Sequence, residues 1–444
     1  MPVASIGPVS LPDVNMETWL IKFDKDGSCT SPETRQALLT RLKQVGDTPV
    51  ILFSHGWNND FDDATELYRK FLVQLQQHLT AQPIGKSTPL FIGVLWPSIW
   101  LSFDSGLRMA AAGDPGPSVS EQQLVNDLSD SLPDPVLQQR FHHLMSQVAL
   151  NVDEVQELAG LLQNTWQVDA EFELNEAASA PTKDEITRAL NALQISVALP
   201  DDDDDLPAGG VIGAAGAAGV AKAAGGLGYF DPRVALRLAS VYKMKDRAGV
   251  VGKVGVSSLI TDALDSINGE LHLVGHSYGC KVVLSGLTHS TSRKKKVSSA
   301  LLLQPAISHL CFASQLPKSG KPAGYAGILV RISHSLLMTY SAKDFPLHNT
   351  FHLALRRDGD LGEVGIAGDA AAPPVPSMYA ALGGYGPRRS EQRLIGQLPE
   401  PRQPFDLPRG SAPVAFDGSD GQINGHSDVT SPYTTWLMYL QLKS

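Results

Sequence analysis

The pattern of hydrophobic positions predicts alternating strands and helices in the first hundred residues. Short apolar runs bounded by turn residues are typical of buried strands, and they occur at residues 18–23, 49–53 and 90–96. Between them, apolar residues recur at helical spacing over residues 31–45 and 60–79. Alternation of this kind is typical of a mostly parallel sheet covered by helices on both faces, so the pattern predicts an α/β fold.

The alternation stops near residue 100 and resumes near residue 231. The intervening stretch has helical patterns, then an acidic run at residues 201–205 and an Ala- and Gly-rich tract at residues 209–228. The acidic run predicts a solvated linker. The tract is interpreted as a hinge or loose helix, with a membrane-contact segment left open. We therefore predict one α/β core from residues 15–100 and 231–444, and a large, mostly helical insertion, a cap or lid, at residues 101–230.

The second half of the chain shows the same kinds of element as the first. Apolar spacing predicts helices at residues 232–245, 257–267 and 433–442, and strands at residues 299–303 and 329–340. Residues 358–413 are rich in Gly and Pro and are expected to be mostly irregular surface.

Composition and charge narrow the function classes. Hydrophobic residues make up 43% of the 444 residues, which allows a large core, and the net charge of −10 argues against a nucleic-acid-binding surface. Three scattered cysteines indicate neither a disulfide framework nor a zinc site. No signal-peptide pattern is visible, so we expect a cytoplasmic location, with export that needs no signal left open.

The most informative motif is Gly-His-Ser-Tyr-Gly at residues 275–279. It follows an apolar run at residues 271–274 and precedes an apolar helical segment at residues 281–287. A serine between a strand and a helix in this pattern is typical of a nucleophile elbow, in which a strained turn exposes the hydroxyl. The five residues alone also fit an ordinary strand-to-helix turn, so the interpretation depends on partners elsewhere in the chain.

Those partners are a histidine base, a carboxylate that orients it, and N–H donors for an oxyanion. Asp344 is the only acidic residue near the end of either strand that follows the motif, and His426 lies in a flexible loop before the last helix. We therefore predict Ser277 as nucleophile, His426 as base and Asp344 as the orienting acid. The alternative acids are Asp417, Asp420 and Asp428. His348 and His352 are expected to be surface or packing residues.

The oxyanion donors are sought in the loop after the strand at residues 49–53. This strand ends in His-Gly-Trp-Asn at residues 55–58. A His-Gly loop after a buried strand predicts the backbone N–H groups of Trp57 and Tyr278 as the donors. The neighbouring aromatic and aliphatic residues fit either an acyl pocket or the core, and both alternatives stay open: Trp57, Trp96, Ile99 and Trp100.

The chain resembles serine esterases and lipases of the α/β-hydrolase superfamily in the order Ser277, Asp344, His426 and in its Gly-His-Ser-Tyr-Gly and His-Gly-Trp-Asn motifs. With Trp-Pro-Ser at residues 96–98, it also resembles a bacterial subgroup of that superfamily. The resemblance covers residues 15–100 and 230–444. It implies an α/β-hydrolase fold and hydrolysis of a carboxylic ester or lipid through an acyl-enzyme, without a metal or organic cofactor.

An insertion that covers the motif favours a small ester or lipid substrate over a peptide. Two alternatives stay open: a phospholipase-type effector that contacts membrane surfaces, and a non-catalytic binding protein that keeps the fold. An acyl acceptor other than water also stays open, and the sequence indicates no oligomeric state.

Overall fold

The structure is a computed structural model of the chain. It describes residues 6–57, 59–98, 119–165, 230–292, 295–317, 320–350, 380–408, 410 and 412–444 and, within 182–191, all but residues 185 and 188.

Eight strands of the described chain form one sheet, in which all neighbouring strands run parallel. Their spatial order is β1-β3-β2-β4-β5-β6-β8-β7. The bounds are β1 (Thr18–Lys22), β2 (Val50–Ser54), β3 (Leu90–Leu95), β4 (Leu271–His276), β5 (Val297–Leu303), β6 (Ile332–Tyr340), β7 (Arg393–Ile395) and β8 (Val414–Asp417). The predicted α/β class is confirmed.

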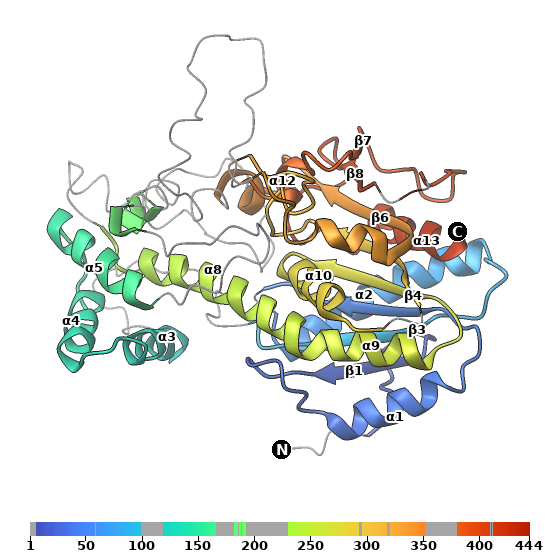
Figure 1. Cartoon of the computed structure of the whole chain (residues 1–444), viewed down its shortest axis with the longest axis horizontal. Helices are drawn as coiled ribbons and strands as arrows, with labels where there is room; N and C mark the ends of the chain where they lie inside the picture. The colour runs from blue at the N-terminus through green and yellow to red at the C-terminus, as the bar shows by residue number, and fades with distance from the viewer. Residues whose placement is uncertain are drawn as a thin grey trace, which may run out of the picture.

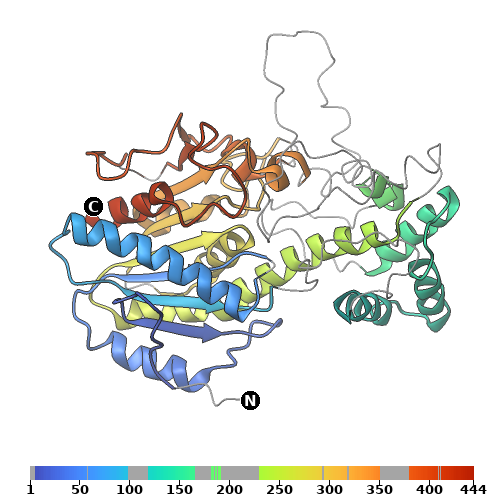
Figure 2. The same cartoon turned by 180° about the vertical axis from the view of Figure 1, so that it is seen from behind.

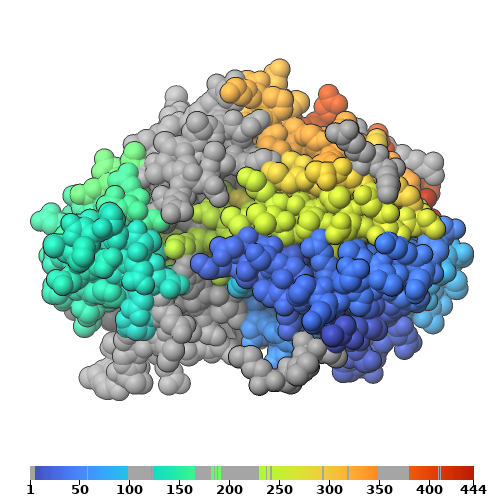
Figure 3. Space-filling view, turned by 60° about the horizontal axis from the view of Figure 1, so that its bottom comes forward, coloured from blue at the N-terminus to red at the C-terminus, as the bar shows by residue number. Residues whose placement is uncertain are grey.

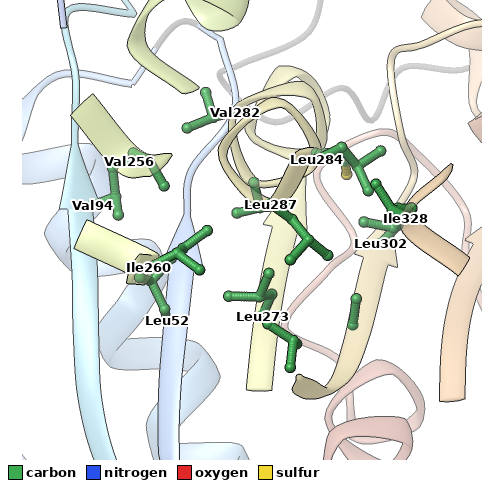
Figure 4. Close-up of a cluster of buried hydrophobic side chains, with 14 of the residues drawn as sticks. Leu52, Val94, Val256, Ile260, Leu273, Val282, Leu284, Leu287, Leu302 and Ile328 are labelled. Atoms are coloured by element: carbon green, nitrogen blue, oxygen red, sulfur yellow. The ribbon is translucent and has the colours of Figure 1, made fainter. Parts of the chain in front are cut away.

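Helices cover both faces of the sheet (Figures 1 and 2). On one face lie α1 (Pro32–Leu42), α9 (Ser257–Ser266) and α10 (Tyr278–His289), and on the other lie α2 (Phe61–Ala81) and α13 (Pro432–Lys443). Each face has its own buried hydrophobic cluster. In the first cluster, Val282 and Leu287 of α10 and Ile260 of α9 gather around Leu52 of β2 and Leu273 of β4 (Figure 4).

The connections after β2 and β4 leave the sheet on opposite faces. β2 leads into α2 on one face, whereas β4 leads into α10 on the other, and the two strands are neighbours in the sheet. Ligands of open parallel sheets bind outside the carboxyl ends of the strands at such a switch point. The fold therefore directs attention to the ends of β2 and β4.

A separate hydrophobic cluster lies mostly in the region predicted as an insertion and extends past residue 230 into the start of the predicted core. It is built from α3 (Val119–Asp130), α4 (Pro135–Met145), α5 (Val152–Thr165) and the first part of α8 (Arg233–Val250). These helices lie beyond the carboxyl ends of the strands (Figures 1 and 2). In Figure 3 the teal α3–α5 region occupies one end of the molecule, and the yellow-green band of α8 and α9 extends from it across the core.

One long helical rod joins this cluster to the sheet. α8 continues through the π-helical segment η2 (Val251–Val256) directly into α9. The two separate helices predicted at residues 232–245 and 257–267 are therefore one continuous helical rod, because Gly252 and Gly255 do not break it. At each glycine an added Cβ would lie 2.5 Å from a backbone oxygen of a neighbouring segment, so these residues permit close packing.

Several predicted boundaries were wrong. The predicted strand at residues 329–340 begins as the 3₁₀ helix η3 (Ala326–Arg331), and β6 starts only at Ile332. The described part of the stretch predicted as mostly irregular is so, apart from two short elements, β7 and the one-turn helix α12 (Leu382–Tyr385). These elements are too short to show a period. The acidic run and the Ala/Gly tract lie outside the described residues. In the part of the chain that the structure describes, no helix is long and apolar enough to span a bilayer.

Candidate active site

Ser277 occupies a sharp turn between β4 and α10. Its φ of 54° and ψ of −123° lie in a backbone region that residues other than glycine rarely adopt. The turn lies against the end of β2, because a Cβ added to Gly279 would lie 2.0 Å from the carbonyl oxygen of Ser54. A glycine is therefore required at position 279, and the first turn of α10 lies directly beside the neighbouring strand.

Ser277, His426 and Asp344 form a continuous chain of hydrogen bonds. His426 Nε2 lies 2.8 Å from Ser277 Oγ, and His426 Nδ1 lies 2.9 Å from Asp344 Oδ2. A carboxylate only accepts hydrogen bonds, so Nδ1 carries the proton and Nε2 is left to accept the serine hydroxyl proton. The arrangement can therefore transfer a proton from Ser277 Oγ to an oriented imidazole.

The Asp344 carboxylate is completely buried. Its Oδ2 accepts from His426 and its Oδ1 accepts from the backbone N–H of Leu347 at 3.1 Å. A buried charge of this kind is tolerated only when hydrogen bonds replace its lost hydration. Each carboxylate oxygen thus has one donor, and Asp344 is held in one orientation.

The alternative acids and histidines have other partners. Asp417 accepts from Ser419 at 2.9 Å, and Asp428 accepts from the backbone N–H of Asn424 at 3.2 Å. His348 stacks on Tyr385 with ring centroids 4.2 Å apart, which makes it a packing residue as predicted, whereas His352 lies outside the described residues. Asp420 lies on an exposed turn.

The loop after β2 passes directly beside Ser277. A Cβ added to Gly56 would lie 2.8 Å from the Ser277 Cβ, and the Trp57 and Tyr278 rings are neighbours with centroids 6.3 Å apart. The two residues predicted as oxyanion donors therefore lie on either side of the elbow, one in the loop after β2 and one at the start of α10.

His55 fixes the orientation of this loop. Its Nε2 accepts from the backbone N–H of Trp96 at 3.3 Å, so its Nδ1 carries a proton and donates to the Gly56 carbonyl at 2.9 Å. Burial lowers the pKa of His55 to about 4, which keeps the ring neutral. In a trans peptide the C=O and N–H point in opposite directions, so the Trp57 N–H points away from His55.

Three supporting residues were missed in the sequence. The Tyr68 hydroxyl on α2 accepts from the His55 backbone N–H at 3.0 Å and donates to the Val94 carbonyl. His276 and Gln304 contact the loop that carries His426. Gln304 directly follows β5, at a strand end that was considered only as a position for the orienting carboxylate. No sequence signal marks Tyr68, because its partners lie on other elements.

The candidate acyl-pocket residues separate into two groups. Trp96 is 4% exposed and stacks on His55 with ring centroids 5.6 Å apart, so it belongs to the core. Trp57 is only partly buried and packs against the hydrophobic cluster that contains Trp96. Ile99 and Trp100 lie outside the described residues. Cys280 is fully buried next to the elbow, as a small apolar group would be.

Comparison with known proteins gives no relative for this chain: no family model, no curated protein and no solved structure matches it. Within the described ranges, no cluster of three or more His, Cys, Asp or Glu side chains is suited to hold a metal ion. The case for function therefore depends on the geometry around Ser277.

Proposed function

We propose that this protein is a serine hydrolase with an α/β-hydrolase fold that cleaves a carboxylic ester or lipid through an acyl-enzyme. The observation that carries the proposal is the hydrogen-bonded chain from Asp344 through His426 to Ser277, with contacts of 2.9 and 2.8 Å. It ends on a serine in a strained strand-to-helix turn, at the carboxyl ends of the strands.

In the proposed reaction His426 Nε2 takes the hydroxyl proton as Ser277 Oγ attacks the acyl carbonyl. The Asp344 carboxylate stabilises the imidazolium that results. The imidazolium then protonates the leaving alcohol as the carbon–oxygen bond breaks, and the acyl group stays on Ser277. Water, deprotonated by His426, attacks the acyl-enzyme, and the proton returns to Ser277 Oγ as the acid is released.

The backbone N–H groups of Trp57 and Tyr278 are proposed to bind the oxyanion of the tetrahedral intermediates. Two features support this: the loop of Trp57 lies against Ser277, and Tyr278 begins a twelve-residue helix whose positive dipole end faces the elbow. A donor of this kind contributes about 2.7–4 kcal/mol to transition-state stabilisation in related chemistry.

The insertion at residues 101–230 is proposed to act as a cap. Its described helices α3–α5 lie beyond the carboxyl ends of the strands (Figures 1 and 2), and Ser277 directly follows the carboxyl end of β4. A cap over a serine nucleophile shelters an apolar acyl group from water, which favours an ester or lipid as the substrate.

The test is hydrolysis of p-nitrophenyl esters of increasing acyl length by the wild type and by Ser277→Ala. The matched control is Ser285→Ala, because Ser285 is a buried serine of α10, the helix that follows Ser277, and its hydroxyl contacts the Tyr325 hydroxyl at 2.8 Å. The proposal predicts activity in the wild type and in the control, and none in Ser277→Ala. Equal activity in all three proteins would show that Ser277 is not the nucleophile, and no activity in any of them would favour a binding protein.

A further inference from the structure

The backbone carbonyl of His426 lies between two buried side chains. Its oxygen is 3.0 Å from His276 Nε2 and 3.1 Å from Gln304 Nε2. The Gln304 carboxamide nitrogen also donates to the Gly425 carbonyl at 2.7 Å. Because a carbonyl oxygen only accepts, both side-chain nitrogens must be donors. Three hydrogen bonds from two side chains therefore hold the backbone that carries the imidazole.

These two side chains come from the strand ends that also hold the nucleophile. His276 is the last residue of β4 and directly precedes Ser277. Gln304 follows β5, where the carbonyl of Leu303 accepts from the Ser277 N–H at 3.1 Å. The same short segments thus fix both the serine backbone and the backbone of the histidine loop.

Gln304 holds its position at an energetic cost. It is fully buried at a φ of 41°, a conformation that favours glycine, and its N–H donates to Thr339 Oγ1 at 3.0 Å. Its Oε1 has no hydrogen-bond partner among the described residues. A strained backbone and an unpaired buried acceptor are each unfavourable, and such costs cluster at functional sites. A glycine would relieve the strain but would lack the carboxamide.

We propose that Gln304, with His276 as the second donor, is a positioning residue that fixes the imidazole of His426 against Ser277. This inference rests on the proposed function. Asp344 fixes the rotation of the ring through Nδ1, whereas Gln304 fixes the backbone from which the ring projects. Both anchors are needed to hold Nε2 at 2.8 Å from Ser277 Oγ.

His276 is suited to act beside a base that becomes charged. Its ring centroid lies 5.1 Å from that of His426, and two charged imidazoles at that distance would repel each other. Burial, followed by the proximity of His426, lowers the pKa of His276 to about 3, so it stays a neutral donor. His276 can therefore hold the His426 carbonyl before and after proton transfer.

The test measures the second-order rate at which an alkyl fluorophosphonate labels Ser277, together with kcat and KM for p-nitrophenyl acetate. The variants are Gln304→Met, which keeps the size but removes the donor, and Gln304→Gly, which suits the positive φ and is expected to fold. The matched control is Gln441→Met, because Gln441 is an equally buried glutamine whose Nε2 donates to Ala300 O at 3.0 Å and to Ser335 Oγ at 3.1 Å.

Both Gln304 variants are expected to react up to about 100-fold more slowly, with kcat reduced and KM little changed, because the base is displaced and binding is not. Gln441→Met is expected to react like the wild type even where it melts earlier. Wild-type rates in either Gln304 variant would overturn the inference while leaving the hydrolase assignment in place. Absence of labelling in the wild type would instead overturn the proposed function.

Discussion

Replacing Asp344 by asparagine tests the orienting role of the carboxylate. The two carboxylate oxygens each accept one N–H, from His426 Nδ1 at 2.9 Å and from the Leu347 backbone at 3.1 Å. An asparagine offers one oxygen and one NH₂ group, so only one of these donors can keep an acceptor as long as His426 Nδ1 keeps its proton. The fully buried site leaves no water to replace the lost bond.

The two orientations of the new amide differ in their consequences. With its NH₂ group toward Leu347, two donors face each other, which costs about 1–3 kcal/mol. With its oxygen toward Leu347, both bonds are satisfied, but the NH₂ group donates to His426 Nδ1 and forces the proton onto Nε2. The second orientation is favoured, and a protonated Nε2 cannot accept the proton of Ser277.

We therefore expect Asp344→Asn to lower kcat by about 10⁴-fold, the size of effect that a wrong tautomer produces in a triad. That factor corresponds to about 5.5 kcal/mol of transition-state stabilisation. The assay is ester hydrolysis near pH 7, with circular dichroism to verify folding. Asp428→Asn is the matched control and should stay within about twofold of the wild type. An Asp344→Asn variant that retains a tenth of wild-type activity, or a large loss in Asp428→Asn, would refute the reasoning.

Three further predictions concern the framework around the site. Gly279→Ala should destabilise the fold by about 3 kcal/mol or more in urea titrations, because its Cβ would lie 2.0 Å from Ser54 O, whereas Gly327→Ala has no atom within 4 Å of the new Cβ and should be neutral. Tyr68→Phe leaves the His55 N–H and the Val94 carbonyl unpaired, so thermal melting should show a loss of about 2 kcal/mol or more, and an unchanged melting temperature would contradict this. The pKa of His55 is about 4 in the folded protein and near 6.5 in the unfolded chain. Between these two values the unfolded chain binds a proton that the folded protein does not, so the free energy of unfolding falls as the pH drops from about 6.5 to about 4. Between pH 7 and pH 5 this contributes a loss of about 2 kcal/mol, which His55→Gln should remove; an equal pH dependence in both proteins would show that His55 is not the cause.

The sequence predicts the central strands well, and there is a physical reason for this. Parallel strands covered on both faces, such as β2 and β4, are continuous apolar runs, and these are visible without any structure. The edge strand β7 has three residues, of which two are exposed, so it shows neither a run nor an alternation. The helical rod through η2 was predicted as two helices because its glycines suggest a break when packing neighbours are unknown.

The residues of the candidate site also differ in whether the sequence reveals them. Ser277 is visible because the elbow places glycines at fixed spacings around the serine, and Asp344 and His426 follow from chain order once the elbow is accepted. Gln304 acts on a loop more than 120 residues away, across contacts that only the folded chain creates. Tyr68 acts on the loop after β2 from the buried face of α2, across contacts between separate elements. A search for acids and bases cannot find such residues, because their role is to hold backbone groups.

The most direct test of the central claim is to locate the site of covalent labelling by a fluorophosphonate. The wild-type protein would be treated with the reagent, and the modified residue would be found by peptide mass spectrometry, with Ser277→Ala treated in parallel. The account predicts one phosphonylated residue, Ser277, and no labelling of the variant. Labelling at another residue, or an unmodified protein after prolonged exposure to excess reagent, would contradict it.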